Sequence, residues 1–266
     1  GNAAGVVENA DQLSDDQILK ATQQLGFPES AFLQTPQNPN AVNFKVRLFS
    51  VRGEVNSCVT ATVAAAFLVA QRLNLSHIVF ETKIGLRELF RQDDGLLMMK
   101  QRAVEFLGIR IDRERIAKLL KISKDALGDT PIELASAGTP KLLIPIKTLK
   151  DLFEIRPDLD AITEYCNEIG GRGFYPFTLE TKTPRSDFHA RQFNPQDGII
   201  EDPVTGVAAA ALTAYFLKHS IITKDRIIGE QGYIIDKPGE IIIQRDGDTV
   251  YVGGYAVSVG QKELEV

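Results

Sequence analysis

Three side chains of this 266-residue chain occupy positions suited to proton transfer: Glu29, Cys58 and Asp202. Cys58 directly precedes an alanine-rich apolar segment, and Asp202 precedes a second one, so both are expected near the N-terminus of a buried helix. Helix N-termini carry unpaired N–H groups and the positive end of the helix dipole, which favour an anion. Two such helix ends facing one cleft would bind the carboxylate of a small substrate.

Each of these residues also has an ordinary structural interpretation. Glu29 lies in a predicted loop between Pro28 and Ser30, and its position alone favours a solvated carboxylate over a general acid/base. Asp202 could transfer a proton or orient a substrate amine, but it could equally cap the helix that follows. Cys58 could be a reactive thiol at a helix N-terminus, although its position favours a small buried hydrophobe.

No pattern in the sequence indicates a bound metal or a cofactor. The three histidines, His77, His189 and His219, have no metal-ligand spacing, and the two cysteines, Cys58 and Cys166, lie far apart. Neither a P-loop nor a dinucleotide-binding fingerprint is present. The sequence therefore predicts a site without metal or cofactor.

Composition excludes several broad classes of protein. Hydrophobic residues make up 44% of the chain and charged residues 24%, which is typical of a globular protein. A net charge of −5 disfavours nucleic-acid binding, and no apolar run approaches the ~20 residues that span a bilayer. With few cysteines and no secretory signal, we expect a cytoplasmic protein with neither nucleic-acid nor membrane partners. The missing initiator Met leaves open a longer natural chain.

Two alanine-rich, almost uncharged helices, predicted over 59–73 and 204–219, are the main clue to the organisation. A helix that is apolar on all sides is a buried helix. Each follows an Arg-x-Phe strand, the first at Arg47 and the second at Arg191. The repeated order of strand, turn and apolar helix predicts an internal duplication.

The remaining elements are expected to surround these two helices. Further helices are predicted over 14–26, 112–121, 148–153 and 157–169, and strands over 43–50, 78–83, 85–91, 96–102, 131–137, 141–147, 173–180, 188–193, 231–236, 239–245 and 249–259. This pattern predicts an α+β fold of two similar domains, each a curved mixed sheet or barrel wrapped round one apolar helix. The first domain is expected over 1–112, completed by about 250–266, and the second over 113–249.

The long motif around Asp202 resembles the signature of the phenazine-biosynthesis-F-like family, which shares the fold of diaminopimelate epimerase. Within 187–209 the chain reads Arg-Gln-Phe-Asn-Pro, then Gly, then Glu-Asp-Pro-Val-Thr-Gly-Val-Ala-Ala. The family signature is Arg-x-Phe-x-Pro, Gly, then Glu-Asp-Pro-x-Thr-Gly-Ser-Ala-Ala. Weaker matches lie at 1–7, 25–32, 231–239 and 252–257, so the resemblance covers nearly the whole chain.

The resemblance implies a cofactor-independent isomerase or epimerase that moves a proton on a small carboxylate-bearing substrate. It places the general acid/base on Glu29 and the aspartate of an interdomain cleft on Asp202. It also implies substrate-binding positions at Asn2, Cys58, Thr60, Thr205, Gly206 and Val207. Homodimers are common among such relatives, so a second copy of the chain is a candidate partner.

Three positions depart from the family pattern. Val59 and Thr60 stand where the family usually has Gly-His, and Val207 stands where it has Ser. Because two polar groups are lost, the alternative function is a catalytically degenerate protein that still binds a small carboxylate. A further alternative is an epimerase based on Cys58, which falls where epimerase relatives have one of two catalytic cysteines, although the partner half offers only Asp202.

Overall fold

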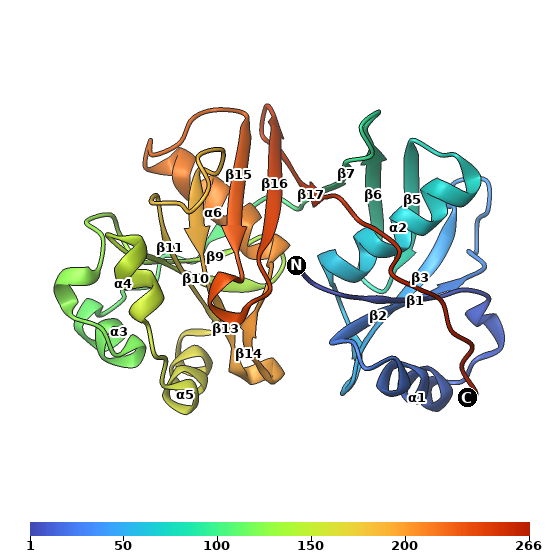
Figure 1. The fold of residues 1–266 in the computed structure, drawn as a ribbon, viewed down its shortest axis with the longest axis horizontal. Coiled ribbons are helices and arrows are strands. Elements are labelled where there is room, and N and C mark those ends of the chain that lie inside the picture. Colours follow the sequence, from blue (N-terminus) through green and yellow to red (C-terminus); the bar gives the residue numbers. More distant parts are fainter. The chain divides into compact units, whose positions relative to one another are not determined.

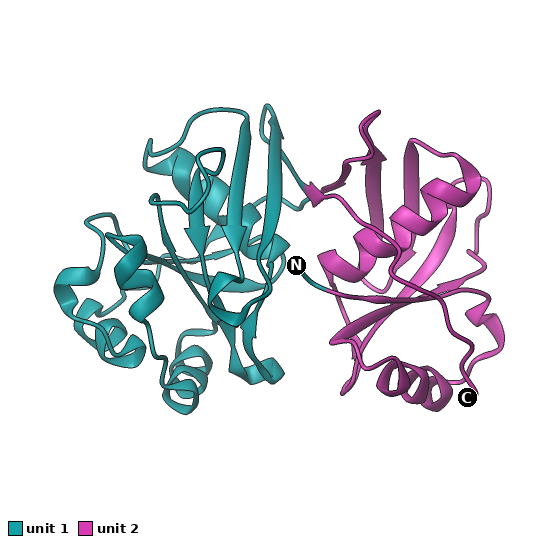
Figure 2. Ribbon diagram, in the orientation of Figure 1, with its two compact units in different colours: residues 1–2, 101–252 teal, residues 3–100, 253–266 magenta.

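The computed structural model describes residues 1–266, which separate into two units (Figure 2). Unit 1 consists of Gly1–Asn2 and Gln101–Val252, and unit 2 consists of Ala3–Lys100 and Gly253–Val266. Both units combine helices with a mixed sheet, which confirms the predicted α+β class. None of the helices combines the length and the apolar composition that a membrane span requires.

Unit 2 folds its sheet around helix α2 (Val59–Leu73). Its strands are β1 (Gly5–Val7), β2 (Glu29–Gln34), β3 (Phe44–Ser50), β4 (Gly53–Val55), β5 (His77–Thr82), β6 (Gly85–Arg91) and β7 (Leu97–Lys100). Strand β2 pairs with β1 in parallel and with β3 antiparallel, β3 also pairs with β4 and β5, and β5, β6 and β7 form a meander. Figure 1 shows α2 lying along this sheet.

The two faces of β2 bury different helices. Ala31 and Leu33 belong to the core around α2, whereas Phe32 between them packs with helix α1 (Asp15–Leu25). This follows from the alternation of side chains along a strand. The face of α2 that meets the sheet is mostly alanine, which lets the helix approach the strands closely.

Unit 1 has helices on both faces of its sheet. Its strands are β8 (Glu105–Phe106), β9 (Glu133–Ser136), β10 (Pro140–Pro145), β11 (Phe174–Thr178), β12 (Phe188–Ala190), β13 (Gln192–Asn194), β14 (Ile199–Asp202), β15 (Arg226–Gln231), β16 (Gly239–Asp246) and β17 (Thr249–Gly254), whose last two residues belong to unit 2. Its helices are α3 (Arg113–Leu120), α4 (Leu149–Glu154), α5 (Leu159–Ile169) and α6 (Gly206–Lys218) (Figure 1).

Strand β10 shows how the core of unit 1 is divided. Leu143 joins the cluster around α6, while Leu142 and Ile144 join the cluster formed with α3 and α5. Helix α6 is buried along most of its length, because its alanines meet aromatic side chains of the strands. This burial explains why α6 has no charged face, as the sequence indicated.

The two units repeat one local arrangement at the strand that precedes each apolar helix. Arg47 Nε lies 2.9 Å from Glu54 Oε1 in unit 2, and Arg191 Nε lies 2.9 Å from Glu201 Oε1 in unit 1. Each guanidinium also lies over the phenylalanine two residues further on, at 5.0 Å and 4.8 Å from the ring centroid. These repeated contacts support the internal duplication.

Three predicted strands needed correction, the first of them at 231–236. The strand predicted over 231–236 is wrong, because Gly232 turns the chain at φ +84 and residues 233–235 form a 3-10 helix. The strand at this place is β15, which ends at Gln231. It was missed because Gly229 interrupts its pattern, yet a Cβ there would lie 2.1 Å from Phe188 Cζ, so only glycine fits.

The predicted strand over 188–193 is divided into β12 and β13. The break falls at Arg191, opposite Pro176 of β11, which has no N–H to donate. Arg191 N still donates to Pro176 O at 2.9 Å, so the chain stays beside β11. The strand predicted over 249–259 is also shorter, since regular structure ends at Gly254.

We expect Gly173→Ala to lower the free energy of unfolding by more than about 2 kcal/mol. Gly173 has φ +108, and a Cβ there would lie 2.5 Å from Phe193 O and 2.6 Å from Gln192 Nε2. Gly138→Ala is the matched control, because Gly138 has φ +132 with nothing within 4 Å of a Cβ. Urea unfolding of both variants separates steric overlap from backbone strain, and equal losses would contradict the steric argument.

Candidate active site

Asp202 stands at the end of β14, three residues before Thr205, the N-cap of α6. Its Oδ1 accepts a hydrogen bond from Asn2 Nδ2 at 3.0 Å, and its Oδ2 accepts one from Thr205 Oγ1 at 2.6 Å. These two neutral donors fix both carboxylate oxygens. The structure therefore brings together three of the residues predicted from the sequence, all in unit 1.

Asn2 also holds the backbone next to Asp202. Its Nδ2 donates to Val204 O at 3.0 Å, and its Oδ1 accepts from Val204 N at 3.0 Å. The side chain thus pairs with Val204 as a neighbouring strand would. The sequence predicted Asn2 as a substrate-binding residue, and the structure gives it contacts that orient Asp202; a contact with substrate stays a prediction.

Thr205 is held by residues that the sequence analysis did not single out. Its side chain does not cap α6, because its hydroxyl is directed to Asp202. Gln231 Nε2 donates to Thr205 Oγ1 at 3.2 Å and also to Asp202 O, while Gln231 Oε1 accepts from Tyr175 OH at 3.2 Å. Gln231 had appeared only within a weak C-terminal motif, and no sequence signal identified Tyr175.

Burial raises the pKa of Asp202 above its ordinary range. Hydrogen bonds from Thr205 and Asn2 act in the opposite direction, as does the positive charge of Lys141. Burial beside this carboxylate also raises the pKa of Tyr175, so its phenol stays protonated and can donate to Gln231. The site therefore holds a carboxyl group that ionises at a higher pH than a solvated aspartate.

We expect the stability contributed by Asp202 to fall as the pH rises. Because its folded pKa lies above the ordinary value of 3.8, the unfolded chain loses this proton first, and ionisation favours unfolding until the folded group has also ionised. On going from pH 4 to pH 7, the free energy of unfolding of Asp202→Asn should therefore rise relative to that of the parent protein. Urea unfolding at both values tests this, and a difference that does not change with pH would contradict it.

Glu29 belongs to unit 2, where it is the first residue of β2. The prediction of a loop was wrong at this residue, because Glu29 pairs with Ser50 at the end of the β2–β3 ladder. Pro28 immediately precedes it and has no N–H for a ladder, which accounts for the start of the strand. Glu29 is partly buried, so it is not an ordinary solvated carboxylate.

Cys58 joins Glu29 to the N-terminus of α2. Its thiol is the N-cap, where Sγ accepts a hydrogen bond from Ala61 N at 3.2 Å, and it donates to Glu29 Oε2 in a short contact. Thr62 Oγ1 donates to Cys58 O at 2.6 Å and fixes the backbone at the cap. A carboxylate and a thiol in direct contact at a helix N-terminus can share and transfer one proton.

The other predicted substrate-binding residues lie in the first turns of the two apolar helices. Thr60 is the second residue of α2, and Gly206 and Val207 are the first two residues of α6. Thr60 and Val207 are partly buried, whereas Gly206 is buried. The helix ends on which these residues stand can bind an anion through backbone N–H groups, and the residues' own contact with substrate stays a prediction.

Two titratable side chains of unit 1 are engaged in the core. His189 is fully buried with Nδ1 2.8 Å from Glu230 Oε1, and burial lowers the pKa of this imidazole. Cys166 is buried in α5, where burial raises the pKa of the thiol. No group of three His, Cys, Asp or Glu side chains is arranged to hold a metal ion.

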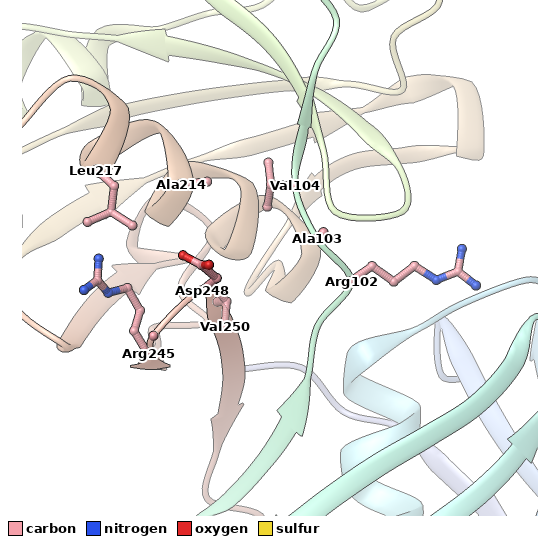
Figure 3. A pocket seen from close by; sticks show the side chains of 9 residues that line it. Arg102, Ala103, Val104, Ala214, Leu217, Arg245, Asp248 and Val250 are labelled. Carbon is pink, nitrogen blue, oxygen red and sulfur yellow. The ribbon is translucent and has the colours of Figure 1, made fainter.

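A cavity of about 510 Å³ lies at the opposite end of α6 from Asp202. Ala214 and Leu217 of α6 line it together with Asp248 and Arg245 near the β16–β17 turn (Figure 3). Figure 3 shows the Arg102 side chain pointing away from the other labelled groups. None of the predicted site residues lines this cavity, so within unit 1 it is separate from the N-terminus of α6.

The family model for phenazine biosynthesis-like (PhzC/PhzF) proteins matches residues 1–262. The chain belongs to this family. An uncharacterised isomerase of Clostridium acetobutylicum is 33% identical to this phenazine biosynthesis-like protein, over 99% of the chain and 93% of its own length. The uncharacterised isomerase YddE of Escherichia coli is 32% identical, over 100% of the chain and 94% of its own length.

Solved structures agree with this assignment. A phenazine biosynthesis protein of the PhzF family from Bacillus anthracis has a TM-score of 0.89 and 26% identity, covering 100% of this family member and 94% of that chain. A hydroxyproline epimerase from Agrobacterium vitis has a TM-score of 0.60 and 10% identity, covering 88% of this chain and 74% of that one, which shows a shared fold. The family and the epimerase-like fold predicted from sequence are therefore confirmed.

Proposed function

We propose that this protein is a cofactor-independent isomerase that moves a proton on a small, carboxylate-bearing substrate. The observation that carries the proposal is the contact between Glu29 Oε2 and the Cys58 thiol at the N-terminus of α2. It gives the chain a partly buried carboxylate with a proton donor at one of its oxygens. The relatives that match over nearly the whole chain are named isomerases, which supports this reaction class.

In the proposed reaction, Glu29 acts as general base and then as general acid. Its carboxylate takes a proton from a substrate carbon, and the electron pair of the broken C–H bond passes into the π system next to that carbon. The protonated Glu29 then returns the proton to a different carbon of the same π system, so the reaction needs no oxidant or reductant. Cys58 donates a hydrogen bond to Glu29 and keeps the carboxylate oriented.

Asp202 and the first turn of α6 supply binding in this proposal. The backbone N–H groups that follow Thr205 suit a substrate carboxylate, and Asp202 suits an amine or hydroxyl group. The hydroxyproline epimerase of the same fold was solved with trans-4-hydroxy-L-proline bound, and a structure described as a probable proline racemase was solved with carbonate bound. The proposal requires that Asp202 and Glu29 act on one substrate, which variants of the two residues test.

A degenerate binding protein is the second candidate function. Val59, Thr60 and Val207 stand at positions where the family has Gly-His and Ser, so polar groups are missing from both helix N-termini. Such a protein would bind a small carboxylate without exchanging its protons. The Glu29–Cys58 contact favours the isomerase, because it holds a proton donor against a partly buried carboxylate at a helix N-terminus.

Proton exchange in D₂O tests the isomerase directly. The protein would be incubated with small amino and hydroxy carboxylates, including proline, hydroxyproline and a dihydro-hydroxyanthranilate, and each carbon-bound proton followed by NMR. We expect loss of one C–H signal of a substrate, with an isomer appearing where the proton returns to another carbon. Ligand-induced shifts without exchange would support the binding protein instead.

The epimerase based on Cys58 makes a separate prediction about alkylation. If the thiol were the catalytic base, iodoacetamide would label Cys58 quickly and a substrate-like carboxylate would block the labelling. We expect slow labelling in the native protein, because Cys58 is buried and its thiol proton is donated to Glu29. Mass spectrometry of Cys58 and of the buried Cys166 as reference gives the comparison; rapid, protectable labelling would support the thiol as base.

A further inference from the structure

Gln231 is a buried polar side chain to which the proposed reaction gives no role. It ends β15 with 1% of its surface exposed, in a row with Ala190 of β12 and Phe177 of β11. Both of these neighbours, and Tyr175 on the same face of β11, belong to the apolar cluster around α6. An amide buried among apolar groups is costly unless its hydrogen bonds are made. The partners of Gln231 therefore indicate why it is there.

The orientation of the Gln231 amide is fixed at both ends. Its Nε2 lies 2.5 Å from Asp202 O, a backbone carbonyl that can only accept, so the NH₂ group faces Asp202. Its Oε1 then faces Tyr175 and accepts from the phenol at 3.2 Å. Burial raises the pKa of Tyr175, so the phenol keeps the proton that this bond requires. The backbone is held as well, since a Cβ on Gly232 would lie 2.9 Å from Pro203 O.

The fixed amide determines where the Thr205 hydroxyl sends its hydrogen. Gln231 Nε2 donates its second hydrogen to Thr205 Oγ1 at 3.2 Å, and an amide nitrogen cannot accept one in return. A hydroxyl has one hydrogen, so that of Thr205 goes to Asp202 Oδ2 at 2.6 Å. The three bonds form a chain that runs in one direction, from Tyr175 through the amide and the hydroxyl to the carboxylate.

The other carboxylate oxygen of Asp202 also faces a donor of fixed direction. Asn2 Oδ1 accepts from Val204 N, which can only donate, so Asn2 Nδ2 must be the atom that meets Asp202 Oδ1. A proton on Asp202 directed at Asn2 or at Thr205 would therefore meet a hydrogen that already points towards the carboxylate. Because Asp202 is only partly buried, its oxygens can accept a further hydrogen bond from a bound molecule.

We propose that Gln231 is a positioning residue that sets the direction of this hydrogen-bond chain, so that Asp202 binds the amine or hydroxyl group of a substrate as an acceptor and does not act as an acid. The inference rests on the proposed binding role of Asp202. Of the two functions open to this carboxylate, orienting a donor group and delivering a proton, the chain favours the first. The hydrogen bonds from Thr205 and Asn2 act in the same sense, because they lower the pKa of Asp202 against the effect of burial.

Titration of the Asp202 carboxyl carbon by ¹³C NMR tests the inference without any substrate, with Asp202→Asn to assign the signal. Gln231→Met keeps the length of the side chain and removes the amide. The Thr205 hydrogen can then turn to the vacated Asp202 O, which lets a protonated Asp202 donate to Thr205 Oγ1. We expect the ionisation midpoint of Asp202 to move to higher pH by about 1 pH unit. Gln196→Met, which removes an amide that donates to Asn167 instead, should leave it at the parent value.

Tyr175→Phe extends the test to the start of the chain. It removes one oxygen atom that bonds Gln231 and not Asp202, so the amide loses one of the two contacts that fix its orientation. We expect a smaller shift of the Asp202 midpoint in the same direction. Added to Gln231→Met, the same substitution should have no further effect, because the chain is already broken.

Equal midpoints in the parent and Gln231→Met would overturn the inference. Additive shifts in the double variant would do the same, since they would show two independent effects on packing. If Gln231→Met does not fold, Tyr175→Phe alone provides the test, and an unchanged midpoint in that variant would contradict the chain. None of these results depends on turnover, so a failure of the isomerase proposal is a separate outcome.

Discussion

Glu29→Gln should abolish proton exchange while leaving the fold intact. General acid/base catalysis contributes roughly 10²–10⁴-fold to a rate, and glutamine cannot accept the proton, so we expect kcat for exchange to fall by a factor in that range. Glutamine has nearly the same shape, and its carbonyl oxygen can still accept the hydrogen bond that Cys58 donates. Ligand affinity should therefore change little, and NMR exchange with ligand titration separates the two effects.

Two controls make this prediction specific. Glu105→Gln removes an exposed carboxylate from β8 and should retain full exchange. Cys58→Ser replaces the thiol with a weaker acid of similar size and should lower the rate less than Glu29→Gln does. Exchange that survives in Glu29→Gln would exclude Glu29 as the base and leave Cys58 or Asp202 as the proton acceptor.

Asp202→Asn should weaken substrate binding by about 10- to 100-fold. A hydrogen bond to a charged group contributes roughly 1.5–3 kcal/mol, and the amide has no negative charge to offer to a substrate amine. The amide also disturbs its neighbours, because its NH₂ group meets the Thr205 hydroxyl that donates to Asp202 in the parent. We expect a larger rise in KM than fall in kcat if Asp202 binds, and the reverse if it transfers a proton.

Asp248→Asn is the matched control for this second prediction. Asp248 is an exposed aspartate that lines the cavity at the other end of α6, so the variant makes the same chemical change in the same unit. It should bind and exchange like the parent protein. Unchanged affinity in Asp202→Asn would show that this carboxylate only organises Asn2 and Thr205.

The sequence predicted the elements whose residues nearly all lie in one kind of environment, because their hydrophobic pattern is then unmistakable. Helices α2 and α6 were visible because helices buried on most sides carry almost no charge. Strand β15 was not, because its central residue, Gly229, is required by contact with Phe188, 41 positions earlier in the chain, and no local pattern reports such a contact. Long-range steric constraints of this kind appear only when the strands are paired.

The candidate site shows the same division between local and distant information. Cys58 and Asp202 could be placed at helix N-termini from local sequence, and Glu29 gained a role only through the resemblance to a family. Gln231 and Tyr175 were not identified as members of the site, because their contacts with Thr205 and with each other join strands that lie far apart in the sequence.

The discontinuous course of the chain through the two units has a consequence for its synthesis on the ribosome. Unit 2 consists mainly of the 98 residues Ala3–Lys100, yet Leu264 and Val266 also pack against its core. The returning chain lies close to β7 as well, since a Cβ on Gly253 would be 1.8 Å from Leu97 O. These later residues emerge only after all of unit 1 has been translated. We therefore expect unit 1 to fold first during translation, and unit 2 to complete its core only after residue 266 has been added.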